Sequence, residues 1–225
     1  MSGTDLPGAV PAQPVRVVLW DADGVLQRVP RGAEESMRPA VEDRVDDVEA
    51  FLLEALAEER PALTGDVRWL DVLPGLLERW GIADAFDDMV RVWLSIEPVE
   101  ESRQVVRELR EAGVTCHLAT NQAQERAAVM RDELGYADLV DGGFYSYELG
   151  AAKPDPAYFR AVLDALSADG VEAGEVFFVD DRADNVASAR SLGIRAEVWC
   201  YRDGADTLRD HLARAGLPVA CRPGT

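Results

Sequence analysis

The sequence predicts an α/β fold, in which helices alternate with the strands of one parallel sheet and a helical segment is inserted after the first strand. A short apolar run over residues 15–20, rich in β-branched side chains, ends at Asp21 and predicts a buried strand. Residues 30–97 then show the apolar spacing of helices and no strand signal. From Pro98 onward helical and strand patterns alternate, which is typical of βαβ units with right-handed crossovers.

The inserted segment has the pattern of about four helices. The clearest of them are predicted over residues 46–60, 67–80 and 86–94. We expect a separate helical lobe whose tryptophans, Trp69, Trp80 and Trp93, form its own core rather than a surface for a ligand.

The elements after residue 98 are bounded by residues that favour their ends. The helix over 98–111 starts at a proline and is followed by Gly113. The helix over 155–168 starts with Asp155 as its N-cap. The remaining predictions are strands at 114–119, 143–147, 176–179 and 195–199 and helices over 122–134, 183–192 and 205–215. We therefore expect an N-terminal tail at 1–14, an α/β core over 15–25 and 98–217, the helical lobe over 26–97 and a C-terminal tail at 218–225.

Composition excludes several classes of function. The 225 residues carry a formal net charge of −19, which repels phosphate backbones and anionic membranes, so we expect neither nucleic-acid nor membrane binding. No apolar run approaches the ~20 residues that a membrane-spanning helix needs, and residues 1–14 do not resemble a signal peptide. Three scattered cysteines, Cys116, Cys200 and Cys221, indicate neither a disulfide framework nor a zinc site, and they favour a cytoplasmic location.

Polar side chains follow the predicted strands at the edge where parallel α/β sheets bind ligands. They are Asp21 and Asp23, then Thr120 and Asn121, then Lys153, and finally Asp180, Asp181, Asp184 and Asn185. Several carboxylates at one edge cannot all stay ionised without a cation, and oxygen ligands favour Mg²⁺. An aspartate there can act as a nucleophile, and a second can move protons. Lys153 is the only lysine among 23 basic residues, which indicates a position that requires an ammonium group.

Four motifs in this order resemble the haloacid dehalogenase (HAD) superfamily, specifically a phosphatase-like member with a helical cap. The motifs are Asp21-Ala-Asp-Gly-Val-Leu26, Ala119-Thr-Asn121, Lys153-Pro-Asp-Pro156 and Val179-Asp-Asp-Arg-Ala-Asp-Asn185. The resemblance extends from residue 15 to about residue 199. It implies a Rossmann-like parallel-sheet core, an inserted α-helical cap, a Mg²⁺ cofactor and an aspartyl-phosphate intermediate.

The resemblance also implies a role for each matching residue. Asp21 would be the nucleophile, Asp23 the general acid and base, and Lys153 a stabiliser of negative charge. Thr120 and Asn121 would bind the phosphoryl group. The residues implied for Mg²⁺ are Asp21, Asp23 through its carbonyl, Asp180, and either Asp181 or Asp184, because the family uses both spacings.

The resemblance leaves several functions open. A small phosphomonoester such as a sugar phosphate is the expected substrate, and the sequence names neither the compound nor the oligomeric state. A phosphomutase would share every motif. A dehalogenase is disfavoured because such members lack the second aspartate, here Asp23. A non-catalytic binding or regulatory protein with the same fold is the third alternative.

Other polar residues are expected to be structural. His117 lies inside a predicted strand, where a hydrogen-bonded core histidine is the favoured interpretation. The arginines at the start of the insertion, Arg28, Arg31 and Arg38, could face a substrate, but we favour solvated side chains.

Overall fold

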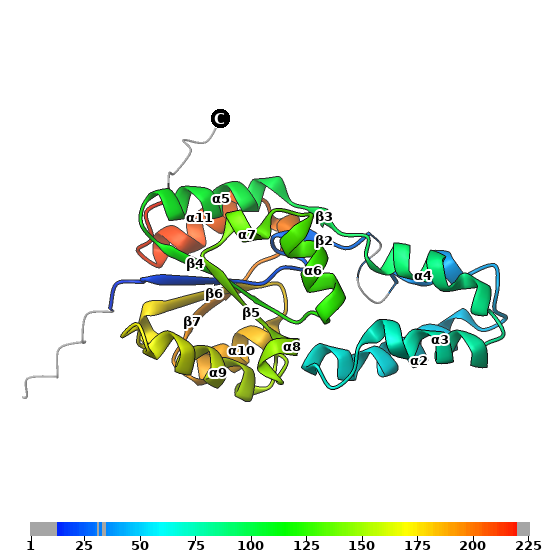
Figure 1. Ribbon diagram of the computed structural model, residues 1–225. Coiled ribbons are helices and arrows are strands. Elements are labelled where there is room, and N and C mark those ends of the chain that lie inside the picture. Colours follow the sequence, from blue (N-terminus) through cyan, green and yellow to red (C-terminus); the bar gives the residue numbers. More distant parts are fainter. Residues whose placement is uncertain (1–12, 31, 33–34, 220–225) are drawn as a thin grey trace, which may run out of the picture.

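The computed structural model describes residues 13–30, 32 and 35–219, and its core is a five-stranded parallel sheet (Figure 1). The spatial order is β5-β4-β1-β6-β7. In chain order the strands are β1 (Val17–Trp20), β4 (Thr115–Thr120), β5 (Gly142–Tyr145), β6 (Val176–Asp180) and β7 (Arg195–Val198). Central β1 pairs in parallel with both β4 and β6, so Val18 lies between Cys116 and Phe177. All five carboxyl ends therefore meet at one edge, and the predicted fold class is confirmed.

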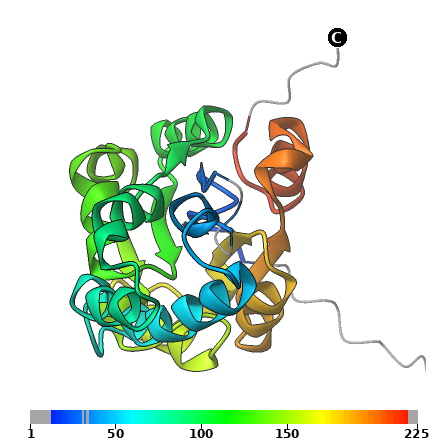
Figure 2. The ribbon, with the colours of Figure 1, turned by 90° about the vertical axis from the view of Figure 1, so that its right-hand side faces the viewer.

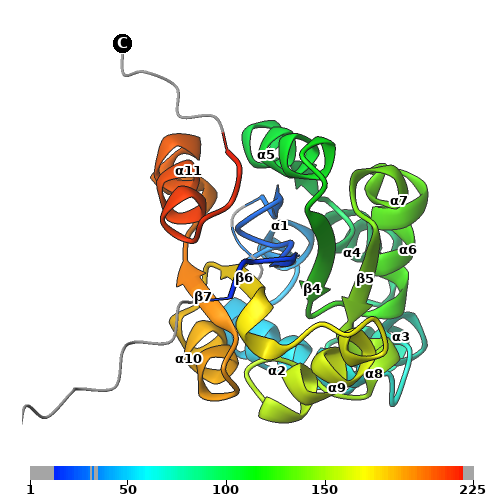
Figure 3. The ribbon, with the colours of Figure 1, turned by 90° about the vertical axis from the view of Figure 1, so that its left-hand side faces the viewer.

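Helices cover both faces of the sheet, as the end-on view of Figure 3 shows. Because side chains alternate along a strand, Val18 and Trp20 pack into one apolar cluster and Val17 and Leu19 into the other. The first cluster is covered by α5 (Glu100–Glu111), α6 (Gln124–Asp132), α7 (Tyr136–Leu139) and α11 (Ala205–Arg214). The second is covered by α9 (Pro156–Ser167) and α10 (Ala183–Ser191).

A third apolar cluster lies in a helical lobe beside the sheet, at the right of Figure 1 and nearest the viewer in Figure 2. It holds Trp69 and Trp93, both fully buried, with their rings 6.2 Å apart. Trp80 is only partly buried and packs against the cluster with its ring edge-on to Phe51. The lobe consists of α1 (Arg38–Val41), α2 (Val48–Glu59), α3 (Trp69–Arg79) and α4 (Phe86–Trp93), with short 3-10 turns at Arg60–Thr64 and Ala83–Ala85.

The structure differs from the predicted elements where strands and helices are short. The chain enters and leaves the lobe through a two-stranded antiparallel ribbon, β2 (Gln27–Arg28) and β3 (Glu97–Pro98). Strands of two residues leave no periodic pattern in the sequence, so this ribbon was not predicted. Pro98, which was expected to begin a helix, belongs to the ribbon, and α5 begins at Glu100. The strand expected over 143–147 ends at Tyr145, because residues from Ser146 onward form α8 (Ser146–Leu149).

Two expectations fall partly outside the described residues, namely the tails and the cysteines. Most of the N-terminal tail (1–12), the end of the C-terminal tail (220–225) and Cys221 lie there. Among the residues described, Cys116 is buried, Cys200 is partly exposed, and both are free thiols. No helix in the described ranges is long and apolar enough to cross a membrane.

Candidate active site

Most of the predicted site residues line one cavity of about 530 Å³ at the carboxyl edge of the sheet, and of the predicted set only Asp180 and Asp184 do not. Asp21 follows β1, Thr120 ends β4, and Asp181 follows β6. Lys153 enters from the loop before α9. The opposite wall comes from the lobe and includes Leu56, Glu59, Arg60 and Trp93. A ligand in this cavity would therefore contact both the core and the lobe.

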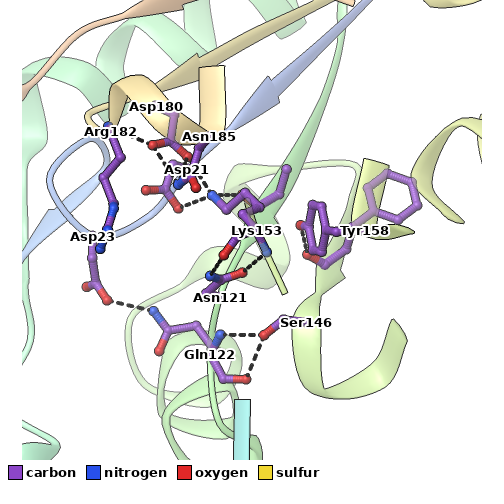
Figure 4. A network of polar contacts seen from close by, with 12 residues as sticks. Asp21, Asp23, Asn121, Gln122, Ser146, Lys153, Tyr158, Asp180, Arg182 and Asn185 are labelled. Atoms are coloured by element: carbon purple, nitrogen blue, oxygen red, sulfur yellow. Dashed lines mark hydrogen bonds and ion pairs between the residues drawn. The ribbon is translucent and has the colours of Figure 1, made fainter. Parts of the chain in front are cut away.

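Lys153 is the centre of a buried charge cluster, drawn in Figure 4. Its Nζ donates to Asp21 Oδ1 at 2.8 Å, to Asp180 Oδ2 at 2.7 Å and to the Ala119 carbonyl at 2.6 Å. Only 1% of the Lys153 side chain is exposed. Three oxygens arranged around one nitrogen match the three donors of an ammonium group, and the planar fork of arginine would not fit them. This contact set explains why a lysine stands here.

The electrostatics of this cluster leave room for a further cation. Burial, together with the nearby Asp180 carboxylate, raises the pKa of Asp21 to about 8, although Lys153 opposes the shift. Burial and Asp180 also raise the pKa of Asp181. Burial lowers the pKa of Lys153, but Asp21 and Asp180 outweigh it and the pKa of Lys153 is raised. One ammonium group therefore does not balance the carboxylates at this edge.

The carboxylates have the arrangement that a hard divalent cation requires. Asp21, Asp180 and Asp181 each offer one oxygen, and these oxygens all lie within 4.8 Å of one another. Oxygen ligands of this kind suit Mg²⁺. Asp184, the alternative to Asp181, is exposed on α10 and does not belong to this group. The donor set therefore fits a magnesium ion, with Asp181 rather than Asp184 beside Asp21 and Asp180.

Backbone geometry holds the site together around these carboxylates. Asp180 Oδ1 accepts the Arg182 N–H at 2.8 Å and the Asn185 amide at 3.0 Å. Gly24 has φ +87°, and a Cβ there would lie 2.2 Å from Asp181 Oδ2. Glycine is therefore required at position 24, because the loop after β1 runs directly against the loop after β6.

Asp23 has a different environment from Asp21, with 30% of its side chain exposed. Its Oδ1 accepts from Gln27 Nε2 at 2.8 Å, and its Oδ2 accepts from Gln122 Nε2 at 2.8 Å. Arg126 lies 3.3 Å from both oxygens. These donors orient the carboxylate, which points into the same cavity as Asp21.

The hydrogen bonds around Asp23 continue into the lobe. Arg126 Nη1 donates to the Trp93 carbonyl at 2.6 Å, and the guanidinium lies over the Trp93 ring at 5.8 Å from its centroid. Trp93 Nε1 in turn donates to Glu59 Oε1 at 2.7 Å. Burial raises the pKa of Glu59, against the opposing effects of Trp93 and Arg126. Asp23 is thus connected to α4 and α2 through one arginine on α6.

Thr120 and Asn121 occupy different surroundings. The Thr120 hydroxyl is buried and has no hydrogen-bond partner among the described residues, and the residue lines the cavity. Asn121 instead binds the Lys153 peptide, accepting its N–H at 2.8 Å and donating to its carbonyl at 2.8 Å. Asn121 therefore positions the lysine loop, and its predicted contact with a phosphoryl group stays a prediction.

Sequence reasoning missed Gln27, Gln122 and Arg126, the three residues that bind Asp23. Two of them could have been found. Gln122 directly follows the Thr120-Asn121 motif, before α6, and Arg126 lies four residues later in α6. Both side chains are buried, and Arg126 Nε donates to Gln122 Oε1 at 2.9 Å.

The residues expected to be structural have varied surroundings. His117 packs edge-on to Phe144 at 5.5 Å, its Nδ1 lacks a hydrogen-bond partner in the described part of the chain, and burial lowers its pKa. Arg38 pairs with Glu35 and Glu49 on the lobe. Arg28 pairs with Glu97 and lines the cavity. Arg31 lies outside the described residues.

The chain is similar to several known proteins. A phosphatase of Mycobacterium tuberculosis, MT3486, is 30% identical over 197 residues, which cover 81% of this chain and 86% of that protein. Two relatives match over shorter stretches. Drimenol cyclase drtB of Aspergillus calidoustus is 49% identical over 73 residues, 31% of this chain and 13% of that protein. Phosphoglycolate phosphatase of Rhodospirillum rubrum is 35% identical over 89 residues, 40% of this chain and 36% of that protein. The chain thus spans well under two thirds of the length of these last two.

A solved structure shares the fold. The HAD family enzyme BT-2542 of Bacteroides thetaiotaomicron superposes with a TM-score of 0.70 at 23% identity, over 88% of this chain and 100% of that one. The same enzyme was also solved in complex with magnesium and inorganic phosphate, at 22% identity and a TM-score of 0.61 over 82% and 93% of the two chains. The sequence model of the haloacid dehalogenase-like hydrolase family matches residues 15–193, and the chain belongs to this family.

Proposed function

We propose that this protein is a Mg²⁺-dependent phosphatase that cleaves a small phosphomonoester through an aspartyl-phosphate at Asp21. The observation that carries the proposal is the pair Asp21 and Asp23, two residues apart and facing one cavity in contrasting environments. Lys153 fixes one carboxylate, and amide and guanidinium donors orient the other. One group is thus placed to attack and the other to move protons.

In the first step a carboxylate oxygen of Asp21 attacks phosphorus, and the bond from phosphorus to the leaving oxygen breaks. Asp23 gives its proton to that oxygen. In the second step water attacks phosphorus, Asp23 takes a proton from the water, and the bond from phosphorus to Asp21 breaks. The first step uses the proton of Asp23 and the second step restores it, so the enzyme returns to its starting state.

The other residues supply binding and charge. Lys153 stabilises the negative charge on Asp21 and on the phosphoryl oxygens. The buried Thr120 hydroxyl, which has no partner in the described chain, is free to donate to a phosphoryl oxygen. Mg²⁺, held by Asp21, Asp180 and Asp181, would neutralise phosphoryl charge and orient the group for in-line attack. The helical lobe covers the cavity as a cap and favours a small substrate.

Names of relatives support the reaction class, since both MT3486 and the Rhodospirillum rubrum protein are named phosphatases. Asp23 argues against dehalogenation, because displacement at carbon leaves no phosphate ester oxygen to protonate. Absence of nucleic-acid and membrane binding and a cytoplasmic location remain predictions from composition.

The experiment is phosphate release from a panel of small phosphomonoesters, with and without Mg²⁺, for the wild type and Asp21→Asn. We expect turnover only with Mg²⁺ and a loss of at least about 10³-fold in the variant. Asp164→Asn, an exposed aspartate on α9, is the control and should retain full activity. Turnover that survives in Asp21→Asn, or a wild type that releases no phosphate with Mg²⁺ present, would contradict the proposal. Isomerised ester without phosphate release would identify a mutase.

A further inference from the structure

We propose that the leaving group of the substrate carries a second anionic group, a carboxylate or a phosphate, which is bound by Arg60, Arg182 and Arg202. This inference rests on the proposed phosphatase function and narrows its substrate class. The three arginines line the cavity that holds Asp21 and Lys153.

The cavity holds arginines whose charge the protein does not pair, although the whole chain has a formal net charge of −19. Of the six cationic side chains that line it, Lys153, Arg126 and Arg28 pair with carboxylates, which leaves Arg60, Arg182 and Arg202. A local excess of positive charge inside an acidic protein favours an anion at that place. Lys153, Thr120 and a Mg²⁺ ion already account for one phosphoryl group, so the surplus of arginine is left for a second anion.

The guanidinium groups of the three arginines also lack partners among the residues that the structure describes. Most arginines here bind carboxylates, as Arg44 binds Asp84 and Asp88. By contrast, the guanidinium groups of Arg60, Arg182 and Arg202 form no ion pair or hydrogen bond with the rest of the described chain, and Arg202 only stacks on the neighbouring Tyr201 ring. Donors that stay unpaired in a cavity are available to a ligand, and guanidinium matches carboxylate or phosphate with two parallel hydrogen bonds.

The positions of these arginines indicate where the second anion lies. Arg60 follows α2 in the lobe, Arg182 follows β6, and Arg202 follows β7 in the core. An anion bound by arginines of both parts would connect the lobe to the core. A neutral leaving group would leave these donors unused.

The test compares matched esters that differ only in the second charge. 2-Phosphoglycolate is compared with 2-hydroxyethyl phosphate, and ribose 1,5-bisphosphate with ribose 5-phosphate. We expect kcat/KM to favour the doubly anionic member of at least one pair by about tenfold or more. The favoured pair identifies carboxylate or phosphate as the second group. If kcat/KM of the doubly anionic ester is equal to or below that of its partner in both pairs, the inference is overturned.

Variants assign the preference to the arginines. Arg60→Gln and Arg202→Gln should each lower the kcat/KM ratio of the favoured pair by about tenfold. Arg160→Gln removes an exposed arginine of α9 that does not line the cavity, and it should change neither the ratio nor the basal turnover. If Arg60→Gln and Arg202→Gln lower kcat/KM equally for both esters of the pair, the arginines do not bind the second anionic group.

A binding measurement separates this inference from the proposed function. Calorimetry with Asp21→Asn and Mg²⁺ compares the affinities of 2-phosphoglycolate, ribose 1,5-bisphosphate and their singly anionic partners. Tighter binding of a doubly anionic ligand without wild-type turnover would support the arginine site and overturn the phosphatase proposal. Turnover by the wild type, with equal affinities for doubly and singly anionic ligands, would support the phosphatase proposal and overturn the arginine site.

Discussion

Asp21 and Asp23 lie two residues apart, yet they belong to different parts of the molecule. Asp21 is 9% exposed and bound to Lys153, entirely within the α/β core. Asp23 is 30% exposed and is held by Gln27, Gln122 and Arg126, the last of which binds the lobe at Trp93. The core therefore fixes Asp21, the proposed nucleophile, by itself, whereas Asp23, the proposed general acid and base, is also connected to the lobe through Arg126. Substitutions around Asp21 in the core and around Asp23 next to the lobe should therefore differ in their effects on stability and on kcat.

The largest effect is expected from Lys153→Met, on the core side. The substitution leaves Asp21 and Asp180 buried without their cation, which should lower the free energy of unfolding by about 3–5 kcal/mol and abolish turnover. Chemical denaturation without metal measures the loss, and Mg²⁺ should recover part of it. Arg160→Met, which deletes an exposed cation, serves as the control. A Lys153→Met protein as stable as the wild type would show that the cluster does not depend on the ammonium group.

Asp23→Asn should lower kcat by about 10²–10⁴-fold, the usual contribution of a general acid and base. Unlike Lys153→Met, it should leave the unfolding free energy nearly unchanged. The asparagine Oδ1 can still accept from Gln122, and the Gln27 amide can turn so that its unpaired Oε1 accepts from the asparagine Nδ2. An ester with a good leaving group, such as p-nitrophenyl phosphate, needs less protonation. In a single turnover, its rate of alcohol release should therefore fall less in the variant than that of an ester with a poor leaving group. Equal losses for good and poor leaving groups would contradict the assigned role.

A smaller effect is expected from Arg126→Gln, which breaks the link between Asp23 and the lobe. We expect kcat to fall by about tenfold with KM nearly unchanged, since Asp23 is then less well placed while the cavity persists. Arg126→Lys keeps the charge and should recover part of the rate. A variant in which KM rises while kcat holds would mean that Arg126 binds substrate instead of positioning Asp23.

Trp93→Phe gives the smallest effect, confined to the lobe. It keeps an aromatic ring in the core but removes the hydrogen bond to Glu59, at a cost of about 1 kcal/mol in unfolding free energy. Trp80→Phe is the matched comparison and removes the hydrogen bond from Trp80 to Glu54. It should lower the unfolding free energy by less, because Glu54 still accepts a hydrogen bond from Arg79 at 3.0 Å. Denaturation curves of the two variants measure the difference, and the reverse order would contradict it.

The same contrast explains what the sequence could predict. Parallel strands bring their carboxyl ends together, so the positions of Asp21, Thr120 and Asp180 at one edge followed from the apolar strand pattern. Lys153 lies in the loop before α9, well after β5 ends, and its assignment to the site depended on the family resemblance of its motif. The choice between Asp181 and Asp184 required side-chain directions at the start of α10, which periodicity does not give.

The contacts of Asp23 could not be predicted in the same way. Gln27 lies in a two-residue strand that leaves no sequence pattern, and Arg126 meets Trp93 only through the packing of core against lobe. The unpaired arginines of the cavity were missed for a similar reason. Among 22 arginines in the sequence, only the structure separates those with carboxylate partners from Arg60, Arg182 and Arg202.

The central claim is that Asp21 becomes covalently phosphorylated, and trapping that bond tests it most directly. Enzyme with Mg²⁺ and a turned-over phosphomonoester is quenched in acid, reduced with borohydride, digested and measured by mass spectrometry. The account predicts that reduction of the acyl phosphate converts Asp21, and not Asp23, to homoserine. With p-nitrophenyl phosphate, whose leaving group needs less protonation, Asp23→Asn should increase the trapped fraction by slowing hydrolysis. Unmodified Asp21 under conditions of active turnover, or modification at another residue, would contradict it.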